Sequence, residues 1–273
     1  MALTVNTNVS SINAQRNLAG TQSALSTSFE RLSTGLRINR SGDDAAGLAI
    51  SEDFKSQIRS LSQAERNAND GVSLLQTAEG ALNEVGGLLS RQRELAVQSS
   101  SGTLDDTQRG YVDQEFQALN DEIDRISATT NFNGTNLLDG STASVDLQVG
   151  INNTANDRIT ATLVDSRTAT LGTGAAAVDT SANAQAAIDL LDTAIETVSG
   201  SRATLGATEN RLQVTVSNLG SARENLSAAN SRIRDVDVAA ETAALTRNNI
   251  LQQAGVSVLA QANQAPSLAL SLL

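Results

Sequence analysis

The sequence contains few of the side chains on which catalysis usually depends. It has no Cys and no His, which removes thiolate nucleophiles, zinc–thiolate sites and the most common general base. Carboxylates are plentiful, and the acid pair Asp43–Asp44 could be a metal-binding pair. A calcium loop needs further spaced oxygen ligands, but the next three residues, Ala, Ala and Gly, supply none. We therefore interpret the pair as the cap of a following helix, beside a turn at Gly42.

Other charged residues follow the pattern of solvated helix surfaces. Asp121 and Arg125 are four residues apart, so they lie on one face of a helix, and Glu94 follows two arginines in the same manner. No Gly-rich phosphate loop of the required form is present. The sequence therefore predicts no catalytic, cofactor-binding or metal site, and a protein that is not an enzyme.

Composition favours long helices. Aromatic residues make up 2% of the 273 residues, and Pro266 is the only proline, so little interrupts a helix.

The net charge of −11 argues against nucleic acid or an anionic membrane as a partner. No apolar run approaches the roughly 18 residues that a membrane-spanning helix needs. The amino terminus lacks the basic and apolar regions of a cleavable secretory signal.

Two apolar heptad rows dominate the chain. Seven residues at spacing seven predict one helix of about 45 residues, about 65–70 Å long. They are Phe54, Leu61, Ala68, Leu75, Leu82, Leu89 and Ala96. A second row contains Leu191, Val198, Leu205, Leu212, Leu219, Leu226, Ile233 and Ala240. Helices of this length exceed any compact domain, so we predict a long antiparallel coiled-coil rod.

A shorter helix and a β region lie between the rows. Apolar spacings of four and three from Val112 to Ile126 predict the helix, with an N-cap in the Asp105–Thr107 cluster. Turn-forming Asn and Gly follow at 131–141. Alternating residues at 145–151 predict a strand that pairs with 158–165, and 166–183 has no period and is interpreted as a loop or short turn-strand.

Both ends of the chain are patchily helical. Apolar residues in these segments are Leu18, Leu25, Leu32, Ile250, Leu251, Val258 and Leu259. The last residues include Leu268, Leu270, Leu272 and Leu273, which need cover in water. Short helices need packing partners, so we expect the ends to become ordered only in an assembly. The simpler alternatives are an intramolecular bundle or a homodimeric coiled coil.

Several long motifs in one order resemble bacterial flagellin. They include "RLSTGLRINRSGDDAAGLAISEDFKSQIRSL", "RELAVQSSSGT", "NFNGTNLLDG" and "ILQQAGVSVLAQANQAPSLALSLL", within matches to about 1–140 and 185–273. The resemblance implies a subunit of a helical filament, exported without a cleaved signal peptide and extracellular in the flagellum. Only about 45 residues separate Gly140 from Gln185, so it implies a short form without outer variable domains.

The resemblance also implies a domain organisation. Residues 1–43 and 230–273 would be paired terminal helices of an inner tube, where neighbouring subunits cover the apolar residues named above, including the closing leucines. Residues 44–229 would be an outer-tube helical rod with a β-hairpin region at about 131–183. The implied fold is mainly α.

The implied partners are copies of itself, hook–filament junction proteins, a filament cap and an export chaperone at the C-terminal helix. A patch of Arg91, Leu95, Gln98 and Glu115 matches residues recognised by a vertebrate innate immune receptor in many flagellins. The same patch is normally buried between subunits, so we expect polymer contact to be its primary role. Ser and Thr in 141–183 suggest O-glycosylation as a hypothesis.

Two other functions stay open at this level. A hook–filament junction protein would share the terminal helices but not the full pair "GDDAAGLAIS" and "ILQQAGVSVLAQANQ". A finite coiled-coil interaction module would form a closed oligomer at high concentration, whereas a filament subunit would form an open polymer.

Overall fold

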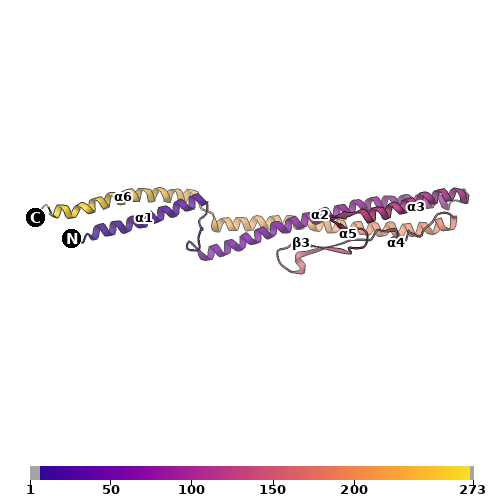
Figure 1. Cartoon of the computed structure of the whole chain (residues 1–273), viewed down its shortest axis with the longest axis horizontal. Helices are drawn as coiled ribbons and strands as arrows, with labels where there is room; N and C mark the ends of the chain where they lie inside the picture. The colour runs from indigo at the N-terminus through magenta and orange to yellow at the C-terminus, as the bar shows by residue number, and fades with distance from the viewer. Residues whose placement is uncertain (1–6, 271–273) are drawn as a thin grey trace. The chain divides into compact units, whose positions relative to one another are not determined.

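The computed structural model describes residues 7–270, with side chains described as far as residue 264. Helices make up most of these residues, and two small antiparallel strand pairs complete the fold (Figure 1). Contacts divide the chain into two units. Unit 1 contains Met1–Ile58 with Glu224–Leu273, and unit 2 contains Arg59–Arg223. None of the helices in residues 7–270 combines the length and apolar character that a membrane span requires.

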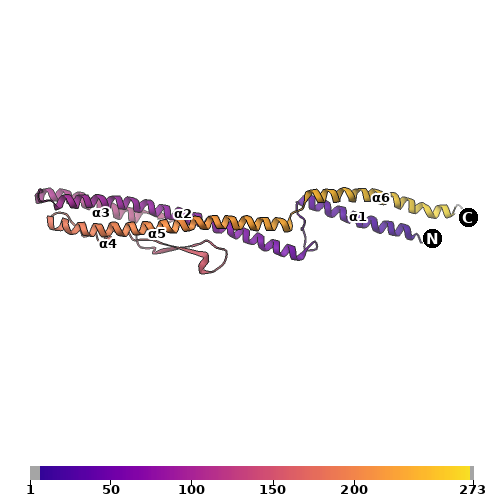
Figure 2. The same cartoon turned by 180° about the vertical axis from the view of Figure 1, so that it is seen from behind.

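Unit 1 pairs the two ends of the chain. Helices α1 (Val9–Thr34) and α6 (Val238–Leu270) lie side by side (Figures 1 and 2). The Asn8 side chain caps α1 by accepting a hydrogen bond from the Ser11 backbone N–H at 3.0 Å. The helix ends at Gly35, whose φ of 72° is the left-handed conformation that glycine adopts most easily. The predicted terminal helices are therefore present and contact each other.

Helix α2 (Ala45–Ser100) begins in unit 1 and continues into unit 2. The Asp44 carboxylate accepts a hydrogen bond from the Gly47 backbone N–H at 2.8 Å, which caps the helix. Asp43 instead closes the preceding turn, where it accepts from the backbone N–H groups of Asn39 and Arg40. The capping interpretation is therefore confirmed for Asp44, and Asp43 belongs to the turn before the helix. The cap also explains why α2 starts nine residues before the heptad row.

The core of unit 2 lies among α2, α3 (Asp106–Thr129) and α5 (Ser181–Arg234). Both heptad rows supply it, as predicted. Its fully buried large side chains include Leu75, Leu82, Leu89, Phe116, Ile123, Leu191 and Leu212. The second row does not form one helix, however, because α5 ends at Arg234 and Ala240 belongs to α6. The turn between them carries Asp235 and Asp237, and Asp237 caps α6 by accepting from the Ala240 backbone N–H at 3.1 Å.

Two hairpins follow α3. Strands β1 (Asn131–Phe132) and β2 (Thr135–Asn136) flank a two-residue turn, in which Asn133 and Gly134 have φ of 49° and 80°. Strands β3 (Ser144–Gln148) and β4 (Arg158–Thr162) pair antiparallel, with Leu147 opposite Ile159. The 3₁₀ turn η1 (Ala155–Asp157) directly precedes β4. The predicted pairing of 145–151 with 158–165 is confirmed for these strands.

The 166–183 segment differs from the loop or turn-strand that its sequence predicts. It contains a one-turn helix, α4 (Thr168–Leu171), and α5 already begins at Ser181. Asp124 of α3 stabilises α4, because its carboxylate accepts from both the backbone N–H and the hydroxyl of Thr168 at 2.8 Å. This helix therefore depends on a contact made 44 residues away in sequence, which local composition does not reveal.

Candidate functional site: assembly surfaces

The contact between α1 and α6 uses part of the predicted apolar set. Leu25 is buried at 6% exposure, while Leu18, Leu32 and Leu259 are half-buried. The helices approach closely at Gly255, where an added Cβ would lie 3.3 Å from Leu18 Cδ1. Polar contacts support the pair. Asn8 donates to the Ala262 carbonyl at 2.7 Å, the Ser11 hydroxyl donates to Asn263 Oδ1 at 2.8 Å, and Arg31 lies 3.7 Å from Glu241.

Other apolar residues of α1 and α6 face away from this contact. Ile250, Leu251 and Val258 are 61%, 50% and 54% exposed. We call the outward apolar residues the terminal face. It comprises Val9, Ile12, Phe29, Val238, Ile250, Leu251, Val256 and Val258. Leu268 and Leu270 belong to α6, but their side chains are outside the described part, as are Leu272 and Leu273 altogether.

The second predicted patch lies in unit 2, on α2 and α3. Arg91 donates to Glu115 Oε1 from Nε at 3.1 Å and from Nη2 at 2.9 Å, and to Glu94 Oε2 from Nη1 at 2.9 Å. These partners, Glu115 first, raise the pKa of the Arg91 guanidinium. Gln98 is exposed one helical turn beyond Glu94. We call the surface of Arg91, Glu94, Gln98 and Glu115 the α2–α3 patch.

Leu95, a predicted member of this patch, is only 2% exposed and belongs to the core of unit 2. Its side chain is therefore not presented at the surface, unlike those of Arg91, Gln98 and Glu115.

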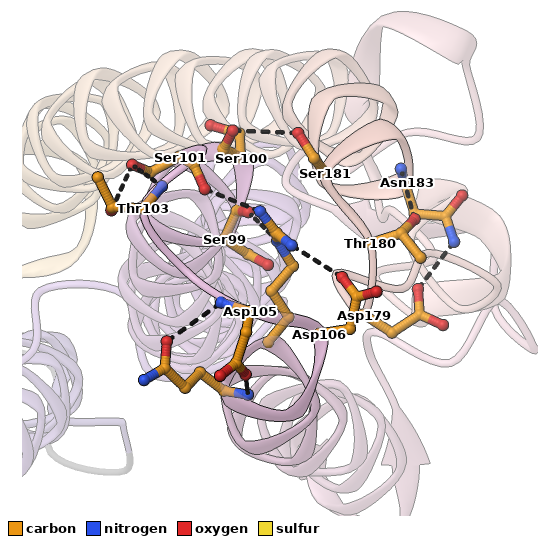
Figure 3. A network of polar contacts seen from close by, with 12 residues as sticks. Ser99, Ser100, Ser101, Thr103, Asp105, Asp106, Asp179, Thr180, Ser181 and Asn183 are labelled. Carbon is orange, nitrogen blue, oxygen red and sulfur yellow. Dashed lines mark hydrogen bonds and ion pairs between the residues drawn. The ribbon is translucent and has the colours of Figure 1, made fainter.

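A network of polar contacts holds the turn that joins α2 to α3 (Figure 3). Arg109, only 7% exposed, donates to the carbonyls of Ser99 and Ser101 at 2.9 Å and pairs with Asp106 at 2.8 Å. It therefore satisfies backbone acceptors at the end of α2 that have no partner within the helix.

The start of α3 is fixed separately. The Asp105 carboxylate and the Gln108 side chain form a reciprocal capping box with each other's backbone N–H. The predicted N-cap in the Asp105–Thr107 cluster is thus confirmed.

Sequence reasoning missed a buried polar pair under this region. Gln92 is fully buried and donates to Asn120 Oδ1 at 2.9 Å and to the Phe116 carbonyl at 3.2 Å. The signal was present, because Gln92 and Ser99 continue the heptad spacing of Ala78 and Val85 with polar side chains. Buried polar residues at such positions need partners, and their partners restrict which helix register is allowed.

Metal chemistry has no visible basis in the described residues. Across residues 7–270, no three His, Cys, Asp or Glu side chains group so as to hold a metal ion. Asp43 and Asp44, the acid pair considered from sequence, are both used in local backbone hydrogen bonds. In the described residues, the two predicted assembly surfaces are represented by the terminal face and the α2–α3 patch.

Known proteins match the chain over almost its whole length. The bacterial flagellin N-terminal helical region matches residues 5–143, and the bacterial flagellin C-terminal helical region matches residues 188–273. A flagellin of Halalkalibacterium halodurans is 50% identical over 98% of this chain and 99% of its own length. A flagellin of Bacillus subtilis and the flagellar filament 33 kDa core protein of Treponema phagedenis are each 44% identical, with the same coverage.

Solved structures of flagellar proteins resemble the fold of this chain. The crystal structure of Bacillus cereus flagellin has a TM-score of 0.51 and 36% identity, and the match covers 60% of this chain and 94% of that one. A putative flagellar hook-associated protein from Vibrio parahaemolyticus, at 14% identity and a TM-score of 0.59, shares the fold. The chain therefore belongs to the bacterial flagellin family, in a short form without outer variable domains, and is a structural subunit of the self-assembling flagellar filament.

Proposed function

We propose that burial of the terminal face between neighbouring copies drives growth of the filament. The observation that carries this proposal is the exposure of eight large apolar side chains on α1 and α6, which the described part of the chain leaves uncovered. A half-exposed Leu that becomes buried contributes on the order of 1 kcal/mol, half the value for a fully exposed one. The inner tube would consist of residues 1–43 and 230–273, and the outer tube of residues 44–229.

A matched pair of substitutions in α6 tests this role. Leu251→Ser removes apolar area from the terminal face, and Gln253→Ser makes the same helix-propensity change at an exposed polar position. We expect Leu251→Ser to raise the critical concentration for polymerisation about fivefold, the equivalent of roughly 1 kcal/mol. Gln253→Ser should leave it unchanged. Sedimentation and electron microscopy give the readout, and equal critical concentrations for both variants would refute the proposal.

We propose the α2–α3 patch as a second surface of contact between subunits. Arg91 and Glu115 hold each other in a fixed pose on two adjacent helices, so a partner would meet an ordered charged surface. Recognition of this patch by a vertebrate innate immune receptor would be a consequence of the same exposed chemistry in the free subunit. Arg91→Ala and Glu115→Ala should be measured for both assembly and receptor activation. Unchanged activation in both variants would exclude the receptor role.

Membership of the family supports further partners. Hook–filament junction proteins and a filament cap would meet the ends of the polymer. An export chaperone would cover the exposed apolar residues of α6 before assembly, since an uncovered face of this kind favours aggregation. Export would proceed without a cleaved signal peptide, to the extracellular flagellum. We assign the chain no catalytic role. Agreement between the intact mass of filament subunits and the mass of the full sequence would support uncleaved export, and a shortened amino terminus would refute it.

A further inference from the structure

Unit 2 contains an apolar groove that the assignments above do not use. The groove has a volume of about 770 Å³ and lies between the β3–β4 hairpin and α5, with α2 contributing to its lining. Its floor consists of core side chains with exposures of 4–8%, namely Leu61, Val149, Ile159 and Leu219. Its rim carries Ile151 at 38% exposure and Val214 at 61%. We call this feature the hairpin groove.

The charges at the hairpin groove are unbalanced. Arg211 is exposed and has no carboxylate within ion-pair distance in the part of the chain that is described. Arg158 bonds only to neutral partners, Gln148 and Asn153. The single acid of the lining, Asp157, is turned toward its own loop, where it accepts from the Thr154 hydroxyl. The groove therefore offers one guanidinium charge in excess beside an apolar floor.

A surface of opposite character adjoins the α2–α3 patch. A shallow hollow of about 390 Å³ is lined by Ser90, Arg93, Glu94, Val97 and Gln98. Val97 is 47% exposed, although it is a large apolar side chain, and the Glu94 side chain is 68% exposed.

The acidic charge of this surface is also in excess. Arg93 is neutralised by Asp192 at 2.5 Å, whereas Glu94 and Glu115 share the single cation Arg91. This surface therefore offers one carboxylate in excess beside an exposed valine.

We propose that the hairpin groove of one subunit binds the Glu94–Val97 surface of a second copy of this chain. Val97 would enter the apolar groove near Ile151 and Val214, and Glu94 would pair with Arg211. Charge complementarity favours this occupant, because a groove with excess guanidinium charge matches a patch with excess carboxylate. The inference rests on the proposal that the α2–α3 patch is a polymer contact, and it names the surface that the patch meets.

The two surfaces are different parts of one subunit, which determines the kind of assembly. Contact between unlike surfaces is heterologous, so each subunit keeps a free groove on one side and a free patch on the other. Such contacts add subunits without limit unless the rotation closes a ring. The pairing is therefore consistent with an open filament.

Charge reversal tests the pairing directly. Arg211→Glu and Glu94→Arg, each alone, should raise the critical concentration at least about tenfold, because like charges then face each other. An equimolar mixture of the two variants should polymerise, since each groove can meet a compatible patch on the other variant. The double variant in one chain should polymerise alone. Arg211→Lys, which keeps the charge, should assemble normally, and circular dichroism of the monomers should confirm that all variants are folded.

The outcomes separate this inference from the proposal beneath it. Rescue in the mixture and in the double variant would establish the pairing. If Glu94→Arg blocks assembly and Arg211→Glu gives no rescue, the α2–α3 patch is a polymer contact but the hairpin groove is not its counterpart. If both single variants assemble at the concentration of the unmodified protein, the groove pairing and the patch contact are both wrong.

Discussion

Removal of the Arg109 guanidinium should destabilise unit 2, because Arg109 bonds to the backbone at the end of α2. Arg109→Met keeps the aliphatic stem and removes the hydrogen bonds to the carbonyls of Ser99 and Ser101 and to the Asp106 carboxylate. The structure predicts unequal contributions from these bonds, because their partners differ in exposure. Ser99 is fully buried, whereas the Asp106 side chain is 84% exposed.

The magnitude follows from that difference. A hydrogen bond from a charged donor contributes about 1.5–3 kcal/mol, and an exposed ion pair less than about 1 kcal/mol. Water can replace the guanidinium at Ser101 but not at the buried end of α2. We therefore expect the free energy of unfolding to fall by about 2–4 kcal/mol, mostly from the orphaned Ser99 carbonyl.

Urea denaturation followed by circular dichroism, on monomers below the critical concentration, measures this loss. Arg125→Met is the matched control, because Arg125 makes only an exposed pair with Glu122 one turn away, at 2.5 Å. Its cost should be below about 0.5 kcal/mol. Equal and small effects for both variants would show that the end of α2 is satisfied without Arg109, and the reasoning would fail.

Two further predictions concern the same unit. Hydrogen bonds from Arg167 lower the pKa of Asp165, and bonds from Ser141 lower the pKa of Asp139. The two ionised carboxylates therefore stabilise the folded state fully above pH 3.8, the pKa of an unfolded Asp, and this contribution is lost as the pH falls toward and through their lowered folded pKa values. Asp165→Asn should weaken the dependence of the free energy of unfolding on pH, measured in urea titrations between about pH 5 and pH 2. An unchanged pH dependence would contradict this prediction. Gly80→Ala should stabilise α2 by about 0.5–1 kcal/mol, because its Cβ meets open space. Gly71→Ala should stabilise the protein less than Gly80→Ala or destabilise it, because the added Cβ would lie 2.4 Å from Leu147 Cδ1. Thermal unfolding measures both variants, and equal gains in stability would show that Leu147 moves freely.

Much of the fold could be predicted because its signals are local. Heptad spacing identified buried residues from Leu61 to Ala96 in α2 and from Leu191 to Leu219 in α5, and alternation identified β3 and β4. Cap chemistry placed the starts of α2 and α3 at the Asp43–Asp44 pair and the Asp105–Thr107 cluster, where the structure shows Asp44 and Asp105 as the caps. Each of these patterns depends on residues within one or two turns of each other, so a single sequence contains them.

Gln92 stood at a heptad position that the sequence shows, and the other misses depend on tertiary contacts. Leu95 lies next to Ala96 of the heptad row, and both are buried in the core to which α2, α3 and α5 contribute. Helix α4 is held by a hydrogen bond to Asp124. Helix α5 ends at Arg234, although the heptad spacing of its apolar row continues to Ala240. The hairpin groove also requires residues from three elements. No spacing rule on one element identifies such a site.

The pairing of α1 with α6 has a consequence for the order in which the chain folds. The hydrogen bond from Asn8 to Ala262 joins residues 254 positions apart, so the first helix has no partner until almost the whole chain is available. Contacts of such long sequence separation carry a high loop-closure entropy and form late. A chain that passes through a narrow conduit from either end would keep both terminal helices unpaired during transit. The α1–α6 pair of unit 1 would therefore form only after both ends of the molecule have left the conduit, so its folding would follow the completed passage of the chain.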